Sequence, residues 1–583
     1  MSRNDELADR FDEFADRLEA DGVAYKPTTY RRAADNIREY QTPIEELVAD
    51  GKDAVQQIDG VGDAIASKAV EYIETGHIEE LDELRESLPV EIEALTRVEG
   101  VGPKTVGALY DALGIRTLDE LAEAAHNEEI RTVSGFGPKT EENIRANIDF
   151  ARSADERERL GEVRPLADEV LTYLRADAAV ERADVAGSIR RWRDTIGDID
   201  VLVATTAPGS VIEFFTRWSA ITDVLQEGDS KASVRAQGVQ IDLRAVDPAE
   251  FGAALQYFTG SKAHNVALRN RAIARELKMN EYGIFDISGV DETAEGQRIG
   301  DRIAGETEQS MYDALELPFI PPELREDRGE VEAAVDDALP TVVAVEDISG
   351  DLHTHTNASD GRVPLKTMVE AALGRGYEYY AVTDHATGAG MVGGVGLTDD
   401  ELREQYDTVA TLNSELDEIE LLHGVESNIT ADGAVSNSDA VLEMMDIVVA
   451  SPHAALRQGR DSATERLIRA VEHPAVDILG HPSGRQINAR SGLELDMEAI
   501  ATAAADAGTA LEINSNPVRL DLNAEYVRTA IKADATIAIN TDAHGPDALS
   551  YIRYGVHTGR RGWCTPSDVL NTFSVEALLE FLH

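Results

Sequence analysis

The sequence predicts a multidomain protein that combines all-helical, α+β and α/β regions. Three observations indicate this. Helical periodicity runs through about the first 150 residues, the middle of the chain mixes helices with carboxylate-bearing strands, and short apolar strands alternate with helices beyond residue 348. A chain of 583 residues is long enough for about four domains, each with a core of its own.

The composition excludes several classes of protein. The single cysteine, Cys564, allows neither a disulfide framework nor a thiolate zinc cluster. No apolar run is long enough to cross a membrane, and the first residues lack the apolar core of a signal peptide. We therefore expect a soluble, cytoplasmic protein with no membrane partner.

The charge is strongly acidic. The formal net charge is −56, and only ten of the 54 basic residues are lysines. A disordered acidic chain is one reading, but 43% apolar residues and clear periodicity argue against it. The better interpretation is the salt-adapted surface of a halophilic archaeon, since molar salt shortens the Debye length to about 3 Å and screens self-repulsion. The net charge therefore says little about DNA binding.

A glycine motif occurs three times in the helical region. An apolar residue precedes Gly-x-Gly, and a helix follows, at Ile58, Val98 and Val133. Each copy resembles the helix-hairpin-helix motif of DNA repair proteins, in which glycines let the backbone approach a phosphate. Three copies are a repeat and predict a sequence-independent grip on DNA. We expect DNA contacts from Gly60, Gly62, Gly100, Gly102, Lys104, Gly135, Gly137 and Lys139, with K⁺ or Na⁺ as candidate ions at the turns.

Two carboxylates stand close together in the middle of the chain. Asp198 and Asp200 share one face of a predicted strand, and without a cation they would repel each other. Magnesium with bound phosphates suits such oxygen ligands. Gly187, Ser188 and Arg191 precede the pair and are suited to hold phosphate oxygens. Asp242, on a later strand, would complete a two-metal site, although alone it would read as a solvent-facing residue.

Histidines and carboxylates recur at the ends of short apolar runs in the last part of the chain. Polar residues at strand C-termini, with helices between the strands, predict a β/α barrel whose site lies at that rim. Six such histidines together with Asp and Glu are the ligand types of metal sites.

Five of these motifs, taken in order, give a family resemblance. GlySerIleArgArg, GlyAspIleAsp, IleAspLeuArg and the stretch from Tyr257 to Arg269, after the glycine repeats, resemble the family X DNA polymerases of bacteria and archaea. The resemblance implies six regions: 1–85, a helical lyase-type domain with the first helix-hairpin-helix; 86–150, fingers with two more; 151–255, a nucleotidyltransferase palm; 256–317, a thumb; 318–347, a linker; and 348–583, a PHP domain.

The resemblance implies roles for the palm and thumb residues. Asp198, Asp200 and Asp242 would bind two Mg²⁺ or Mn²⁺ ions, with Asp242 activating the primer 3′-hydroxyl for in-line attack on the α-phosphate. Ser188, Arg191 and Gly197 would hold the β- and γ-phosphates of the nucleotide. Tyr257, Phe258 and Gly260 would line its sugar, and Asn265 and Arg269 would face its base and the template, while Lys231 would contact DNA.

The family also implies a 5′-deoxyribose-phosphate lyase in the first domain. Its Schiff-base lysine matches Lys68, and Lys26, Tyr30 and Arg32 would surround the 5′-phosphate. Ala64 and Glu80 stand where that pocket has two further basic residues. The alternative is that Lys68 only contacts DNA.

The last region resembles the PHP domain, a distorted (β/α)7 barrel that holds two or three metal ions, here Mn²⁺ or Zn²⁺. Such a site activates water for attack on phosphoesters, which implies a 3′→5′ exonuclease, with abasic-site or 3′-phosphate processing as further activities. All nine ligand positions are filled, with Glu426 as the bridging residue: His353, His355, Asp360, His385, Glu426, His453, His481, Asp542 and His544.

The sequence thus predicts a monomeric DNA-directed DNA polymerase that fills short gaps in base excision repair, joined to a nuclease that trims 3′ ends. Its partners would be gapped or primed DNA and deoxynucleoside triphosphates. Three alternatives remain: a PHP nuclease with a weak polymerase, a DNA end-binding protein with vestigial centres, and a phosphatase for a small metabolite.

Overall fold

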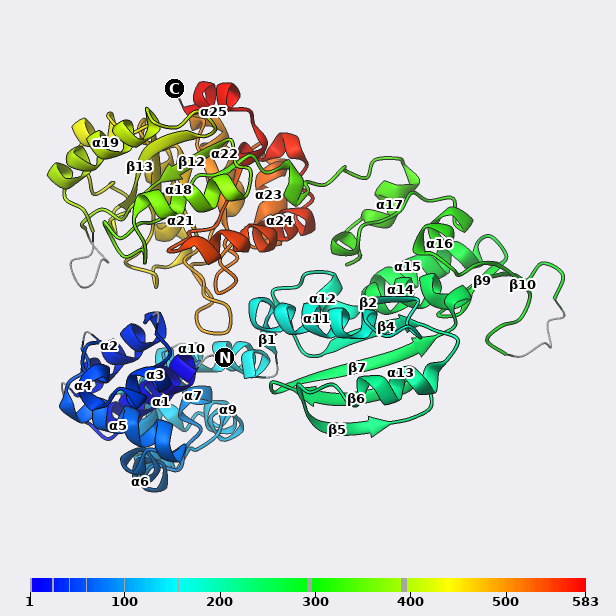
Figure 1. Cartoon of the computed structure of the whole chain (residues 1–583), viewed down its shortest axis with the longest axis horizontal. Helices are drawn as coiled ribbons and strands as arrows, with labels where there is room; N and C mark the ends of the chain where they lie inside the picture. Colours follow the sequence, from blue (N-terminus) through cyan, green and yellow to red (C-terminus); the bar gives the residue numbers. More distant parts are fainter. Residues whose placement is uncertain are drawn as a thin grey trace. The chain divides into compact units, whose positions relative to one another are not determined.

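The chain forms two compact units in a computed structural model, residues 1–156 with 488–490 and residues 157–487 with 491–583 (Figure 1). The structure describes residues 3–23, 26–40, 42–58, 60–98, 100–155, 157–290, 296–388 and 396–582. Each unit is described by itself.

The first unit is helical. Two buried clusters hold it together, one built from residues between Leu7 and Leu81 and the other from residues between Val90 and Ile148. Its helices are α1 (Arg3–Ala20), α2 (Lys26–Glu39), α3 (Ile44–Ala49), α4 (Lys52–Val55), α5 (Asp63–Thr75), α6 (Glu79–Ser87), α7 (Ile92–Thr96), α8 (Pro103–Leu113), α9 (Leu118–His126) and α10 (Pro138–Asp155), with a 3₁₀ turn, η1 (Ile130–Thr132), before α10.

Each glycine repeat opens a helix, as the sequence predicts. Gly62 caps α5, Gly102 caps α8, and α10 starts one residue after Gly137. The first glycine of each repeat has positive φ: 74° at Gly60, 89° at Gly100 and 94° at Gly135. Glycine adopts this backbone conformation without the strain that a Cβ atom imposes. Asp59 and Glu99, between the apolar residue and the glycines of the first two repeats, lie outside the described residues.

The second unit begins with the palm. Its five-stranded sheet has the order β2-β4-β7-β6-β5, and β4 and β7 run parallel. The elements are β1 (Glu158–Arg159), α11 (Leu160–Arg175), β2 (Arg182–Val185), α12 (Gly187–Arg190), β3 (Thr195–Ile196), β4 (Ile199–Ala204), α13 (Pro208–Phe215), β5 (Ile221–Glu227), β6 (Lys231–Ala236) and β7 (Val239–Val246).

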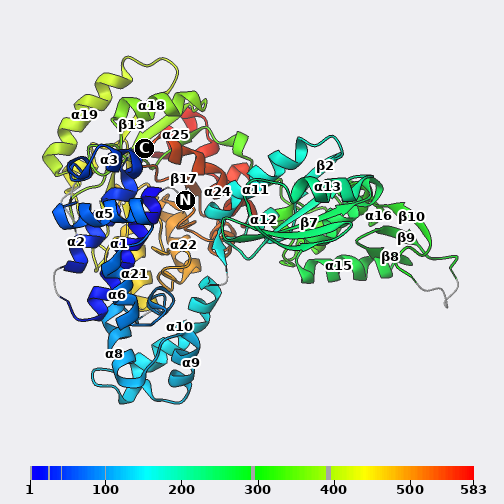
Figure 2. The ribbon, with the colours of Figure 1, turned by 60° about the horizontal axis from the view of Figure 1, so that its bottom comes forward.

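Alternation along β4 assigns its two faces. Val201 and Val203 join the cluster formed with α11 and α13, whereas Leu202 and Ala204 pack against α14 (Phe251–Thr259) of the thumb. Since side chains two residues apart share a face, Asp200 lies on the α14 side of the sheet. The ribbon in Figure 2 shows this sheet beside α11 and α13.

The thumb and the segment after it pack as one body. The elements after the palm sheet are η2 (Pro248–Glu250), α14, α15 (Lys262–Ile273), β8 (Leu277–Asn280), β9 (Gly283–Asp286), β10 (Asp301–Ala304), α16 (Glu308–Ala314), η3 (Pro322–Leu324), α17 (Glu330–Val335) and η4 (Val345–Asp347). The stretch 318–347, expected as a linker, carries α17 and buries Arg325 and Glu330. Leu324 and Val331 belong to the thumb cluster, so this stretch is a packed extension of the thumb.

Seven parallel strands follow in sequence order, from β11 to β17, with helices around them (Figure 1). The strands are β11 (Gly350–Asp351), β12 (Tyr379–Val382), β13 (Glu420–Asn428), β14 (Ile447–Ser451), β15 (Ile478–Leu479), β16 (Ala510–Asn514) and β17 (Ile537–Asn540). The helices are α18 (Leu365–Gly374), α19 (Asp399–Asn413), α20 (Asp439–Leu442), α21 (Arg460–Val471), α22 (Met497–Ala507), α23 (Ala524–Lys532), η5 (Pro546–Tyr551), α24 (Ile552–Arg561), η6 (Pro566–Asp568), η7 (Leu570–Thr572) and α25 (Val575–Leu582).

The seven strands curl into a nearly closed barrel. Thr354, after β11, bridges Ala543, after β17, and His355 N donates to the Ala543 carbonyl over 2.9 Å. These contacts join the first and last strands at the rim. The expected β/α barrel with seven strands is therefore confirmed.

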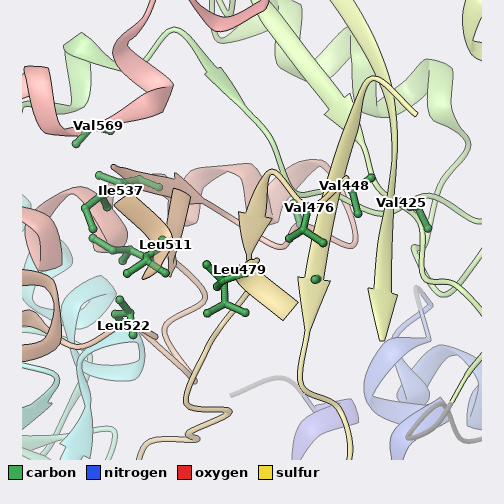
Figure 3. Close-up of a cluster of buried hydrophobic side chains, with 14 of the residues drawn as sticks. Val425, Val448, Val476, Leu479, Leu511, Leu522, Ile537 and Val569 are labelled. Atoms are coloured by element: carbon green, nitrogen blue, oxygen red, sulfur yellow. The ribbon is translucent and has the colours of Figure 1, made fainter. Parts of the chain in front are cut away.

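Two apolar clusters show which side chains of the barrel strands point outward and which point inward. Outward residues such as Val425, Leu511 and Ile537 form the cluster against the surrounding helices (Figure 3). Inward residues such as Ala510 and Ala538 form a second cluster, against which Leu579 of α25 packs. The polar residues at positions 426, 512 and 540 also point inward, because they alternate with outward-pointing residues of the same strands. They lie inside the barrel, closer to the C-terminal ends of the strands than this apolar layer.

The palm and the barrel share a core. Ile487, Leu520 and Tyr554 of the barrel region belong to the palm cluster that contains α11. Asp194 of the palm pairs with Arg485 over 2.9 Å and with Arg561. His557 of α24 stacks on Trp192, with ring centroids 3.6 Å apart. Apolar and charged contacts together hold the two halves of this unit.

No helix among the residues that the structure describes is both long and apolar enough to span a membrane.

Candidate active sites

The palm brings together its three predicted carboxylates. The parallel pairing of β4 and β7 sets Asp200 opposite Asp242, and Asp198 lies two residues before Asp200. One oxygen from each of the three carboxylates lies within 4.8 Å of the others. Asp242 alternates with the buried Ile241 and Leu243, as its sequence pattern predicts.

The electrostatics of this trio favour a cation. Burial, followed by repulsion from Asp198 and Asp242, raises the pKa of Asp200 to about 7. Burial and Asp242 also raise the pKa of Asp198, and Arg157 only partly offsets them. Three oxygen donors that repel one another in this way fit a hard divalent ion, which would lower all these pKa values.

Gly187 lets the loop that is predicted to bind phosphate, residues 187–191, approach the carboxylates. Its φ is 61°, and a Cβ atom there would lie 2.3 Å from Asp200 Oδ2. A side chain at this position would therefore displace the carboxylate. Gly197 has more room, because its Cβ atom would meet only Arg157, at 3.4 Å. Ser188 lies in the same short helix, α12, directly after Gly187.

Arg191 donates hydrogen bonds to the thumb and to its extension. Its Nε donates to Glu326 over 2.8 Å, and its Nη1 donates to the Thr259 carbonyl over 2.7 Å. Glu326 also pairs with Arg193, and these arginines overcome the effect of burial to lower its pKa. Arg191 thus links the loop to the thumb, and its contact with a nucleotide phosphate stays a prediction.

The predicted sugar-binding turn is held by Asn265. Its Nδ2 donates to the carbonyls of Tyr257, over 2.7 Å, and Gly260, over 3.3 Å. A Cβ atom at Gly260 would lie 2.7 Å from Asn265 Oδ1, so this contact requires glycine. Asn265 therefore shapes the turn, whereas Arg269 is exposed on α15.

A cavity of about 240 Å³ opens beside the carboxylates. Asp200, Asp242, Arg244, Lys231 and Phe258 contribute to its wall. The Arg244 guanidinium lies over the Phe258 ring, 4.5 Å from its centroid. Lys231, which the sequence predicted to contact DNA, thus lies on the same cavity wall as Asp200 and Asp242, and Arg244 was not predicted from the sequence.

In the first unit, the residues expected around a 5′-phosphate differ in exposure. Lys26 is exposed, and Arg32 lies against the turn at Gly60, where its Cγ would be 3.3 Å from an added Cβ atom. Tyr30 is only 6% exposed, and its ring packs against Phe11 and Phe14. The Tyr30 ring is therefore part of the core, and its contact with a 5′-phosphate stays a prediction.

Lys68 has an acidic partner. Its Nζ lies 2.7 Å from Glu80 Oε2 and 5.5 Å from the centroid of the Phe14 ring. Burial alone would lower the pKa of Lys68, but the hydrogen bond that Lys68 donates to Glu80 and the contact with Tyr30 outweigh it, so the pKa lies above its ordinary value. A raised pKa leaves less of the neutral amine that a Schiff base needs.

The barrel collects all nine of its predicted ligands at the C-terminal ends of the strands. Three groups have ligand atoms within 4.8 Å of one another: His355, Asp360, His385 and His544; His353, His355 and Asp542; and His385, Glu426 and His453. His481 falls outside these groups, but its Nε2 lies 3.0 Å from Glu426 Oε1.

Glu426 lies at the centre of the barrel site. Its Oε1 faces His453 at 3.2 Å and His353 at 3.4 Å, and its Oε2 faces His355 at 3.7 Å. Burial would raise the pKa of Glu426, but the histidines outweigh it and hold the pKa well below its usual range. This geometry fits the expected bridging role.

Unpartnered buried atoms support a metal site. Within the described residues, His353 Nε2, both ring nitrogens of His355 and Glu426 Oε2 are buried without a hydrogen-bond partner of suitable geometry. Buried polar atoms rarely stay unpaired, and imidazole nitrogens with carboxylate oxygens are the donors that zinc and manganese prefer. The residues present therefore fit divalent ions.

Several supporting residues of the barrel were missed from the sequence. Asp384 accepts hydrogen bonds from Thr356 N, over 2.7 Å, and Ser359 Oγ, over 2.5 Å, and so holds the loop before Asp360. Asn428 Oδ1 lies 2.7 Å from His453 Nδ1. The available signal was polar residues within or directly after apolar strands, as in ThrAspHis at 383–385.

Comparisons with known proteins agree with the predicted family and with its domain types. Four family models match: helix-hairpin-helix domain (2–78), SAM-like helix-hairpin-helix tandem (92–148), DNA polymerase beta thumb (254–326) and PHP domain (351–516). A DNA polymerase/3′-5′ exonuclease PolX of Bacillus subtilis (strain 168) is 34% identical over 561 residues, covering 96% of this chain and 95% of the relative.

Two further relatives each cover part of the chain. DNA polymerase lambda of Rattus norvegicus is 24% identical over 348 residues, covering 55% of this chain and 56% of the relative. A probable phosphatase of Shewanella sp. (strain ANA-3) is 30% identical over 249 residues, covering 40% of this chain and 90% of the relative.

The fold, the clusters of candidate metal ligands and the relatives together define the class of protein. It is an enzyme that uses divalent metal ions and acts on DNA, with a nucleotidyltransferase palm and a phosphoesterase barrel. The chain belongs to the family X DNA polymerases that carry a PHP domain, the PolX family. It is a DNA polymerase with an exonuclease or phosphoesterase activity, and its substrates are DNA and deoxynucleoside triphosphates.

Proposed function

We propose that this enzyme is a monomer that fills short gaps during base excision repair and trims 3′ ends before or after extension. The observation that carries the proposal is the completeness of both sites: three carboxylates meet in the palm, and all nine predicted ligand residues meet at the barrel rim. An end-binding protein with vestigial centres does not require either set.

The palm residues suit two-metal nucleotidyl transfer. Bound divalent ions, which we propose to be Mg²⁺ or Mn²⁺ in the palm and Mn²⁺ or Zn²⁺ in the barrel, neutralise developing charge and activate water, respectively. Asp242 would accept the proton of the primer 3′-hydroxyl, and Asp198 and Asp200 would hold divalent ions that offset the charge of the triphosphate. Lys231 and Arg244, beside this trio, add positive charge to the cavity wall.

The barrel residues suit phosphoester hydrolysis at a 3′ end. A likeness of this region to a probable phosphatase, of which it covers 90%, also favours removal of a 3′-phosphate. We therefore propose 3′-phosphatase activity beside the exonuclease. A primer that ends in a 3′-phosphate should become extendable by the wild type, but should stay blocked with His353→Ala.

One incubation tests the main proposal. Gapped DNA with nucleotides should be extended to fill the gap, and without nucleotides it should be shortened from the 3′ end, under a scan of Mg²⁺ and Mn²⁺. Asp200→Ala should remove only the extension, and His353→Ala or Asp542→Ala only the shortening. Shortening that survives both barrel substitutions would overturn the barrel assignment.

The acidic composition favours work at high salt. We propose that activity persists at molar KCl, because the helix-hairpin-helix turns contact phosphate through backbone N–H groups more than through lysines, with K⁺ or Na⁺ as candidate ions there. DNA affinity that falls as steeply with salt as that of a lysine-rich protein would contradict this proposal.

A further inference from the structure

Glu512 is a buried carboxylate of the barrel that no ligand motif includes. It lies in β16, two residues after Ala510, which belongs to the inner apolar layer. Since side chains two residues apart share a face, Glu512 also points into the barrel, and it is 0% exposed. Its strand neighbours Leu511 and Ile513 face outward into the cluster of Figure 3.

Its carboxylate contacts two of the metal-site histidines, which come from different strands. Oε1 lies 2.7 Å from His353 Nδ1, and Oε2 accepts the backbone N–H of His481 over 2.7 Å. Asn540 Nδ2 also donates to Oε1, over 3.0 Å. The ends of β11 and β15 are thus joined through one side chain of β16.

The contact with His353 fixes the protonation pattern of that ring. A carboxylate oxygen can only accept, so Nδ1 carries the hydrogen, and in the neutral ring Nε2 then keeps its lone pair. That Nε2 faces Asp542 Oδ1 at 3.8 Å and Glu426 Oε1 at 3.4 Å, and within the part of the chain that the structure describes it makes no hydrogen bond. An unprotonated, fixed nitrogen is what a metal ion requires.

The other ligand histidines with an outer partner are held differently. His453 Nδ1 meets the amide of Asn428, and His544 Nδ1 meets the carbonyl of Asp542. Among the described ligands, His353 is the histidine whose outer nitrogen meets a carboxylate that is not itself a ligand. A carboxylate raises the basicity of the ring more than a neutral acceptor does.

We infer that Glu512 is a positioning residue that sets the metal affinity of the group formed by His353, His355 and Asp542. The inference rests on the proposed metal site of the barrel. Removing such a partner lowers metal affinity by about 10- to 100-fold. Both carboxylate oxygens of Glu512 are already engaged, one by His353 Nδ1 and the other by the His481 N–H, so its loss should act through metal affinity and leave turnover at saturating metal largely intact.

The decisive variant is Glu512→Gln. Its amide oxygen can accept from His353 Nδ1 or from the His481 N–H, but not from both, because the other terminal atom is itself a donor. Asp477→Asn is the matched control, since Asp477 is a partly buried barrel carboxylate that accepts the Val448 N–H over 2.7 Å and contacts no ligand.

The experiment measures Mn²⁺ binding by equilibrium dialysis with metal analysis, in an Asp200→Ala background that weakens the palm site. We expect Glu512→Gln to weaken binding of at least one ion by about 10- to 100-fold, with Asp477→Asn like the parent. The apparent Mn²⁺ constant of the exonuclease should rise by the same factor, with kcat at saturating Mn²⁺ within about threefold.

Wild-type affinity in a folded Glu512→Gln protein would overturn the inference. If that variant does not fold, Glu512→Asp keeps the charge but shortens the reach by about 1.5 Å, and the same two outcomes apply to it. His353→Ala distinguishes a failure of the proposed metal site from a failure of the role proposed for Glu512. If His353→Ala also binds Mn²⁺ like the parent, the metal site assigned to the barrel is wrong. If His353→Ala loses Mn²⁺ binding while Glu512→Gln keeps it, only the role of Glu512 is refuted.

Discussion

Asp194 offers a test of how the barrel supports the palm. It lies on the loop between Arg191 and Asp198, and its carboxylate is held by Arg485 and Arg561 of the barrel region. Burial would raise the pKa of Asp194, but the two guanidiniums outweigh it and hold the pKa well below its usual range. Asp194→Ala leaves both arginines without this partner.

The structure sets the size of the effect. Breaking a fully buried ion pair costs about 3–5 kcal/mol. The side chains of Asp194, Arg485 and Arg561 are 22%, 14% and 7% exposed, so we discount this to about 2 kcal/mol. If the ordered conformation of the loop becomes less stable by this free energy, nucleotide binding must supply it. The KM for nucleotide then rises by up to about 30-fold, while kcat and the exonuclease activity stay within about threefold of wild type.

Single-nucleotide gap filling under steady state measures KM and kcat separately. Glu213→Ala is the control, because its pair with Arg217 is exposed on both sides, at 62% and 73%, and should contribute little. The effect of Asp194→Ala should persist at 2 M KCl, since a buried pair is poorly screened. A KM equal to that of Glu213→Ala would refute the reasoning.

Three further predictions follow from single sites. Asp200→Asn should reduce extension by more than about 10³-fold and leave the exonuclease intact, measured on one gapped substrate; residual extension above that would remove Asp200 from the chemistry. Borohydride trapping on a 5′-incised abasic substrate should give little adduct with wild type and more with Glu80→Ala, because loss of Glu80 lowers the pKa of Lys68; efficient trapping by wild type would contradict the raised pKa. Burial raises the pKa of Asp477 to about 7, so its contribution to stability is full below pH 4 and is lost as the pH rises to 7. Asp477→Asn should therefore gain up to about 2 kcal/mol over wild type between pH 5 and pH 8, seen as a widening Tm difference; a constant difference would show that Asp477 does not titrate there.

The sequence could predict which side chains meet at the two sites, because each of these residues follows a local pattern; their role as metal ligands stays a prediction. Asp242 alternates with buried apolar residues, and the barrel ligands lie at or just beyond apolar strands, so strand direction alone places them at one rim. The glycine repeats were equally local, since positive φ and a helix start lie within three residues of each other.

What the sequence did not predict depends on contacts far apart in the chain. Glu512 contacts His353 across 159 residues, and Arg485 contacts Asp194 across 291. No spacing rule links such pairs, and a lone carboxylate in a strand reads as solvated. Tyr30 was likewise predicted only as a DNA contact from its motif position, and the sequence did not show that its ring also fills a core. The stretch 318–347 read as a linker because burial of Arg325 and Glu330 depends on distant partners.

The palm shares a core with three residues of the barrel region, Ile487, Leu520 and Tyr554. This shared core affects how the activities of truncated forms of the enzyme should be interpreted. A fragment ending near residue 347 would expose the palm surface that these side chains cover and would leave Asp194 without either arginine. Its loss of polymerase activity would then measure a damaged fold, although every catalytic carboxylate is present. Point substitutions in the full-length chain are therefore the sound way to assign each activity to its half.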